Sequence, residues 1–212
     1  MYRAIAFSAV AGLVTALGIV LMRIWRRRAL RYGHLINSFA AGLILAASLN
    51  GLLPRALKEM DHAPLYAVGG FIVFLVLEIF LVMHSGAEVH YKADARRGAR
   101  GVVFFWGLLL HSFIDGLVIA VAFATDVRLG IMTSLAVIGH ELPEGITTYS
   151  LLSERLSEAM SLGMAAAVAL ATPVGGVAGV ALLPYVGDGL LGPAIAVAAG
   201  SFLYIAAADI VP

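Results

Sequence analysis

The chain has 212 residues, of which 61% are hydrophobic and only 13% are charged, and its mean hydropathy is +0.97. A soluble domain of this length could not cover so much apolar surface, so the composition excludes that class and indicates a multi-span membrane protein. The net charge of +1 gives no reason to expect nucleic acid as a partner. Because there is no cysteine, disulfides, thiolate metal sites and cysteine nucleophiles are excluded, and any metal site must use nitrogen and oxygen ligands.

Seven apolar runs are long enough to cross a bilayer as helices of roughly 20 residues. They show no alternating pattern, which favours helices over barrel strands. The first run is longer than a signal-peptide core and is followed directly by arginines, so we expect it to be a retained span. We therefore predict an all-α, multi-span membrane protein that forms a single membrane domain (1–212), with spans near 4–22, 35–53, 65–83, 102–123, 130–152, 160–183 and 191–211.

The basic residues are distributed unevenly over the two sides of the predicted spans. Ten of the fourteen follow spans one, three and five, and four lie on the other side. The positive-inside bias therefore predicts an outer N-terminus and odd-numbered loops in the cytoplasm, as in a protein of the plasma (inner) membrane. The ten are Arg23, Arg26, Arg27, Arg28, Arg31, Lys92, Arg96, Arg97, Arg100 and Arg155, and the four are Arg3, Arg55, Lys58 and Arg128.

A weak internal repeat links spans two and seven. In both, an Ala-Ala-Gly triplet is followed by proline twelve residues after its glycine, at Gly42 and Pro54 and again at Gly200 and Pro212. The two spans run in opposite directions, as an inverted-topology repeat requires. We expect an eight-helix (3+2+3) parent architecture, of which this chain carries seven helices without the last. Its parts are a first three-helix repeat (4–83), a central helix pair (102–152) and a partial second repeat (160–212).

Two polar motifs interrupt spans four and five. Each places a histidine four residues before a carboxylate, so both side chains share one helix face. Each histidine lies roughly 15 Å into its span, near the middle of a hydrocarbon core of about 30 Å. The two spans are antiparallel neighbours, so the polar faces can meet at one depth. The motifs are His111-Ser112-Phe113-Ile114-Asp115-Gly116 and His140-Glu141-Leu142-Pro143-Glu144-Gly145.

The carboxylates in these motifs need a counter-charge. A charged residue at the bilayer centre costs about 2.5–3.5 kcal/mol, so three unpaired carboxylates would cost on the order of 8–10 kcal/mol. Protonation or a divalent cation bound by imidazole and carboxylate would offset most of this cost. Pro143 removes the backbone hydrogen bond to the carbonyl of Gly139, and Pro173 would do the same to Ala169. Helices broken in this way line many transporter ion sites.

The third loop adds two histidines, His84 and His90, on the predicted cytoplasmic side. It is either a solvated linker or a weak metal-collecting segment near an inner exit. We therefore treat both histidines as weaker metal candidates.

The paired motifs resemble the signature of the ZIP (zinc- and iron-regulated-transporter-like) metal transporters, and span seven (199–204) resembles that family's penultimate helix. The resemblance implies uptake of divalent metal into the cytosol, with five candidate ligands: His111, Asp115, His140, Glu141 and Glu144. Ser112, a weaker candidate, stands where many members have asparagine. Thr172 stands where some binuclear members have glutamate, so we expect one dominant metal site.

Zinc is the expected substrate, since two imidazoles plus carboxylates suit it, although iron, manganese, cadmium and cobalt remain open. We expect transport by alternating access, no enzymatic activity and no cofactor, with the metal ion and the bilayer as partners and self-association into a homodimer left open. The alternatives are helix–helix glue, a metal-sensing membrane protein, and an intramembrane hydrolase. The last would need a second histidine where Glu144 stands.

Overall fold

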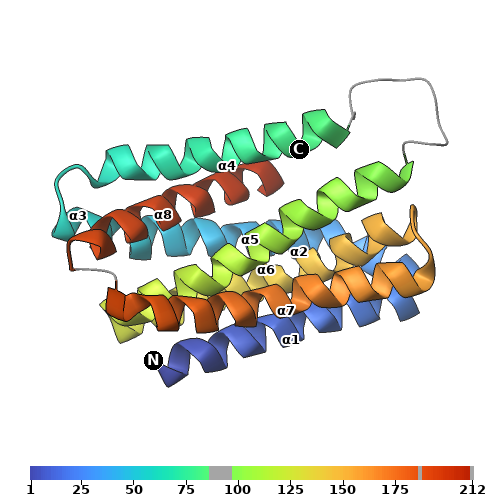
Figure 1. Cartoon of the computed structure of the whole chain (residues 1–212), viewed down its shortest axis with the longest axis horizontal. Coiled ribbons are helices and arrows are strands. Elements are labelled where there is room, and N and C mark those ends of the chain that lie inside the picture. Colours follow the sequence, from blue (N-terminus) through green and yellow to red (C-terminus); the bar gives the residue numbers. More distant parts are fainter. Residues whose placement is uncertain (86–96, 186–187, 211–212) are drawn as a thin grey trace.

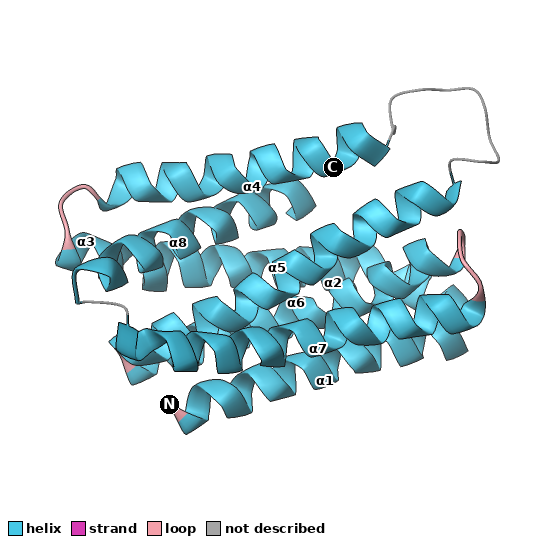
Figure 2. Cartoon of the chain, viewed as in Figure 1, coloured by secondary structure: helices cyan, strands magenta, loops and turns pink. Residues whose placement is uncertain are grey.

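The computed structural model describes the chain except for residues 86–96, 186–187 and 211–212, and it describes the backbone alone for 78–85, 97–104, 188 and 208–210. Every regular element in the described part is a helix (Figure 2). In chain order they are α1 (Tyr2–Ile24), α2 (Arg26–Ala47), a π-helical turn (Ser48–Leu52), α3 (Leu53–Glu59), α4 (Ala63–Ser85), α5 (Arg97–Thr125), α6 (Val127–Ser153), α7 (Glu158–Leu182), a 3-10 turn (Leu183–Tyr185) and α8 (Asp188–Ile210).

The predicted spans are confirmed as helices. Because the π turn joins α2 to α3 without a break, and the 3-10 turn extends α7, the described residues form seven rods, one for each predicted span. Five of the rods are long and apolar enough to cross a membrane by length and composition: 2–24, 26–59, 105–125, 158–185 and 189–207. The described part of α4 qualifies only as a shorter apolar helix (63–77). The remaining rod, α6, carries the second polar motif.

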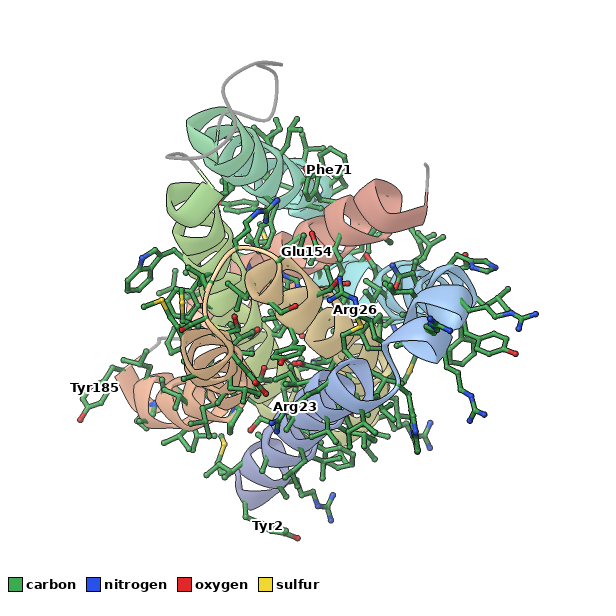
Figure 3. The ribbon with its side chains drawn as sticks, turned by 90° about the vertical axis from the view of Figure 1, so that its right-hand side faces the viewer. Tyr2, Arg23, Arg26, Phe71, Glu154 and Tyr185 are labelled. Atoms are coloured by element: carbon green, nitrogen blue, oxygen red, sulfur yellow. The ribbon has the colours of Figure 1, made fainter. Side chains whose placement is uncertain are left out.

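The rods run alternately in opposite directions (Figure 1). α1 packs against α6 and α7, α5 packs against α6 and α7, and α4 packs against α8, with α2 contacting both α6 and α8. The alternation gathers charged helix ends at one end of the molecule, which Figure 3 views end-on. There Arg23 pairs with Glu158 at 2.8 Å and Arg26 pairs with Glu154 at 3.0 Å. These exposed pairs join the start and end of neighbouring rods.

Among the side chains that the structure describes, the buried core forms two apolar clusters separated along the helix axes. The larger one includes Ala136 and Val137, which precede the second motif on α6. The smaller one includes Ile146 and Tyr149, which follow that motif, together with Met22 at the end of α1. The polar motifs therefore lie between two apolar layers, near the middle of the bundle.

A π turn at Ser48–Leu52 is a feature that hydropathy does not predict. The Ser48 side chain is buried and donates a hydrogen bond to the carbonyl oxygen of Ala199 on α8, with an Oγ–O distance of 2.8 Å. The π turn therefore lies where the end of α2 contacts α8.

Candidate metal site

The two histidines are the central residues of their helices. α5 has 29 residues, and fourteen lie on each side of His111; α6 has 27, and thirteen lie on each side of His140. The matched depth expected from the sequence is therefore present in the folded chain. The helices are antiparallel and joined by a single residue, Asp126.

Asp126 fixes the start of α6. Its Oδ1 accepts hydrogen bonds from the backbone N–H of Leu129, at 3.1 Å, and of Arg128, at 2.8 Å. This is an N-cap, in which a carboxylate satisfies amide groups that have no partner within the helix. The same two hydrogen bonds hold the pKa of the exposed Asp126 carboxyl below its usual range. The cap thus fixes the residue at which α6 begins.

Four of the five candidate ligands converge between α5 and α6. One ligand atom from each of His111, Asp115, His140 and Glu144 lies within 4.8 Å of the others. Asp115 Oδ2 is 2.8 Å from His140 Nε2 and 3.3 Å from His111 Nε2. His111 Nε2 is also 3.8 Å from Glu144 Oε2. The side chains are only 2–18% exposed. The structure therefore makes one buried cluster of two imidazoles and two carboxylates.

The spacing of these atoms suits a small divalent cation. Zinc bonds to imidazole nitrogen and carboxylate oxygen are about 2.1 Å long, so neighbouring ligands in a tetrahedron lie roughly 3.4 Å apart. The three atom pairs given above, at 2.8, 3.3 and 3.8 Å, bracket that value.

Further hydrogen bonds orient the side chains of the cluster. His140 Nδ1 lies 3.1 Å from the carbonyl oxygen of Ala136, which leaves Nε2 for the cluster. Ser112 Oγ donates to Glu144 Oε1 at 2.6 Å, while Glu144 Oε2 is the oxygen nearer to His111. Ser112, predicted as a weaker ligand, thus contacts a candidate ligand, and its own role as a ligand stays a prediction. Partners of this kind fix ligand orientation in metal sites.

Two glycines that directly follow the clustered carboxylates let neighbouring helices approach. A Cβ atom at Gly116 would collide with the carbonyl oxygen of Thr172 on α7, and one at Gly145 would collide with the carbonyl oxygen of Thr15 on α1. Small residues at helix crossings allow this close backbone contact in membranes. At the site, α5 therefore packs closely against α7, and α6 packs closely against α1.

Glu141 is not part of the four-residue cluster. Its side chain is fully buried, and its two oxygens accept hydrogen bonds from threonines on different helices. Oε1 bonds Thr172 Oγ1 on α7 at 2.7 Å, and Oε2 bonds Thr15 Oγ1 on α1. The geometry thus separates Glu141 from the other candidates, and its role as a ligand stays a prediction.

The other sequence expectations have mixed outcomes. The backbone of α6 continues as a helix through Pro143, and that of α7 through Pro173, so neither proline breaks its helix. His84 lies in the last turn of α4 with its side chain outside the described residues, and His90 lies outside them altogether. Neither can be placed relative to the site.

Two contacts of the site were missed from the sequence. Phe74 of α4 packs edge-on against the His111 ring, with ring centroids 6.4 Å apart. Thr15 belongs to a stripe of small residues on α1, with Ser8, Gly12 and Gly18 at helical spacing. That stripe was the available signal for a closely packed polar contact.

Comparison with known proteins agrees with the geometry. The family described as ZIP Zinc transporter matches residues 83–212, more than half of the chain. Zinc transporter ZIP4 of Mus musculus is 38% identical over 108 residues, which is 50% of this chain and 16% of ZIP4. Zinc transporter ZIP10 of Homo sapiens is 36% identical over 141 residues, covering 61% of this chain and 15% of ZIP10.

A longer match is that to zinc transporter ZIP13 of Pongo abelii, 26% identical over 195 residues and covering 82% of this chain and 56% of ZIP13. The chain thus spans only part of the length of these relatives. The family match covers α5 and α6, which carry all four clustered residues. The chain belongs to the ZIP zinc transporter family.

Proposed function

We propose that this chain carries a divalent metal ion, with zinc preferred, across a membrane through the cluster of His111, Asp115, His140 and Glu144. The observation that carries the proposal is the meeting of four ligand atoms, within 4.8 Å of one another, at the centres of two antiparallel helices. Ionisable groups at this depth are costly and mark ion pathways. A bound divalent ion would offset that cost.

The ligand set supports zinc over harder cations. Two imidazoles and two carboxylates can complete a tetrahedron, the geometry that zinc prefers, whereas magnesium and calcium favour six or more oxygen ligands. Iron, manganese, cadmium and cobalt accept the same donor atoms, so their uptake relative to zinc is an outcome of the test. Release of the ion would follow from alternating access to the cluster from the two sides.

The direction and membrane of transport are further parts of this proposal. We infer that the end carrying Arg23 and Arg26 faces the cytoplasm, that the N-terminus is outside, and that metal moves inward across the plasma (inner) membrane. Support comes from the excess of basic residues on that side of the predicted spans, ten against four. The homodimer stays a prediction.

The helix packing also supports the proposed inverted repeat. α1 closes on α6 beside Gly145, and α7 closes on α5 beside Gly116. We therefore propose that α1 and α7 occupy equivalent places in two oppositely oriented units. A hydrolytic role for Glu141 is disfavoured, because two threonines already bind its carboxylate oxygens.

Metal uptake into vesicles that contain the full chain tests the proposal. The variants His140→Ala and Asp115→Ala each remove a buried ligand and should abolish uptake of zinc. Matched controls are His62→Ala and Asp61→Ala, which change the same residue types at exposed positions between α3 and α4. Uptake by both site variants at the rate of these controls would refute the assignment of the site.

A further inference from the structure

We infer that Glu141 is a positioning residue, which ties α6 to α1 and α7 through Thr15 and Thr172 and thereby holds the four-residue cluster in register. This inference rests on the proposed function, because it assigns a role to a neighbour of that site. The three residues, Thr15, Glu141 and Thr172, are called the threonine clamp below.

The clamp joins three helices at one point. Thr15, Glu141 and Thr172 are all fully buried, and they come from α1, α6 and α7 respectively. Thr172 Oγ1 donates to Glu141 Oε1 at 2.7 Å, and the hydroxyl of Thr15 contacts Oε2. Since a buried carboxylate without partners would be strongly destabilising, the two hydroxyls are what allow Glu141 to lie there.

The two threonine hydroxyls each reach another helix. Several serine and threonine side chains inside these helices bond only to a carbonyl of their own helix, as Thr125 does to Val121 at 2.9 Å. Thr15 lies 3.1 Å from the carbonyl oxygen of Ala11 in that way, but it also reaches Glu141 on another helix. The clamp is therefore an inter-helix contact and more than a local satisfaction of polar groups.

Its position allows it to control the rotation of α6. Glu141 follows His140 by one residue, which places the two side chains about 100° apart around the helix. A rotation of α6 by about 10° would move a ligand atom about 5 Å from its axis by roughly 0.9 Å. Metal–ligand distances tolerate about 0.2 Å. Fixing both oxygens of Glu141 therefore keeps His140 and Glu144 directed at α5.

The chemistry distinguishes a clamp from a ligand. Glutamine in place of Glu141 retains one oxygen acceptor and gains one amide donor, and a threonine hydroxyl can bond to either group. Glu141→Gln therefore keeps much of the clamp while weakening any metal bond. Glu141→Leu removes both functions. The double variant Thr15→Val with Thr172→Val removes the clamp and leaves the carboxylate.

The experiment measures zinc uptake by the full chain in vesicles, and the absorption spectrum of the cobalt-loaded protein, for these variants. We expect Glu141→Leu and the double valine variant each to raise KM by about 10- to 100-fold, the usual effect of losing a residue that orients ligands. The rise in KM caused by Glu141→Gln should be at least tenfold smaller than the rise caused by Glu141→Leu. Its cobalt spectrum should match that of the unchanged chain, since the four ligands remain.

Two further variants separate positioning from folding. Thr15→Ser and Thr172→Ser keep the hydroxyls, so their KM should stay close to that of the unchanged chain. The control is Thr125→Val, which removes a hydroxyl that bonds only within α5. Adding Thr15→Val to Glu141→Leu should cause little further loss, because both changes break one contact.

The opposite pattern would overturn the inference. If Glu141→Gln were as damaging as Glu141→Leu and changed the cobalt spectrum, while the double valine variant transported normally, Glu141 would be a ligand. Uptake by both His140→Ala and Asp115→Ala at the rate of their controls would instead refute the proposed function. The two failures are therefore distinguishable.

Discussion

Ser112 provides a sharp test of how the site is assembled, because its hydroxyl contacts the proposed ligand Glu144 without belonging to the cluster. Ser112 Oγ lies 2.6 Å from Glu144 Oε1 and 2.9 Å from the carbonyl oxygen of Leu108. The single hydroxyl proton makes the shorter contact with the carboxylate. Ser112→Ala removes that hydrogen bond, so the Glu144 carboxylate is held less firmly in its orientation toward His111.

The size of the effect follows from the charge of the acceptor. A hydrogen bond to a charged group contributes about 1.5–3 kcal/mol, and every 1.4 kcal/mol changes an equilibrium tenfold. The buried position of both residues argues against replacement of the hydroxyl by solvent, since Ser112 is fully buried and the side chain of Glu144 is 6% exposed. We therefore expect Ser112→Ala to weaken zinc affinity by about 10- to 150-fold.

Competition between zinc and a chromophoric chelator, with purified protein in detergent, measures this change, and KM for uptake gives a second readout. The control is Ser134→Ala on α6. That serine is also fully buried, but it donates to the carbonyl oxygen of Gly130 in its own helix, at 2.6 Å. Zinc affinity within twofold of the unchanged chain for both variants would refute the claim that Ser112 orients Glu144.

Three other predictions concern the helices around the site. Gly116→Ala forces a methyl group against the carbonyl of Thr172, so thermal denaturation in detergent should show a loss of roughly 1–3 kcal/mol, and an unchanged melting temperature would contradict the close approach of α5 and α7. Asp126→Ala should lower the melting temperature at neutral pH. Because the folded pKa of Asp126 is depressed, this penalty exists above the pKa of the unfolded carboxyl and should disappear as pH falls through the folded value, which a pH series of melts would measure. Thr133→Val and Thr148→Val remove buried hydroxyls that have no hydrogen-bond partner among the described residues, so both variants should be as stable as the unchanged chain or more stable, and a lower melting temperature would contradict this.

The positions of the helices could be predicted from the sequence because the bilayer leaves few alternatives. Backbone groups in lipid must bond within their own segment, so a long apolar run becomes a helix whatever its neighbours are. The π turn at Ser48–Leu52 could not be predicted in this way. Its shift in hydrogen bonding accompanies a tertiary contact, from Ser48 to Ala199 of α8, and nothing local to α2 signals that contact.

The four clustered residues were predictable for a similar reason. The spacing of four within each motif places a histidine and a carboxylate on one helix face, and the short α5–α6 connection then fixes the partner helix. The contacts of Glu141 could not be predicted in the same way. The sequence places it about 100° from His140, but which helix lies in that direction depends on how α1 and α7 pack.

The separation of Glu141 from the cluster changes the electrostatics of the site. If all three carboxylates faced one ion, they would bring three negative charges to a divalent cation. The structure directs Asp115 and Glu144 to the cluster and directs Glu141 to two neutral hydroxyls. Two ionised carboxylates would match the charge of one divalent ion, and the two imidazoles would complete the proposed ligand set. A monovalent ion would leave a buried negative charge uncompensated at mid-membrane, which is costly. If the proposed function holds, we therefore expect the site to favour divalent over monovalent ions, whichever divalent metal is preferred.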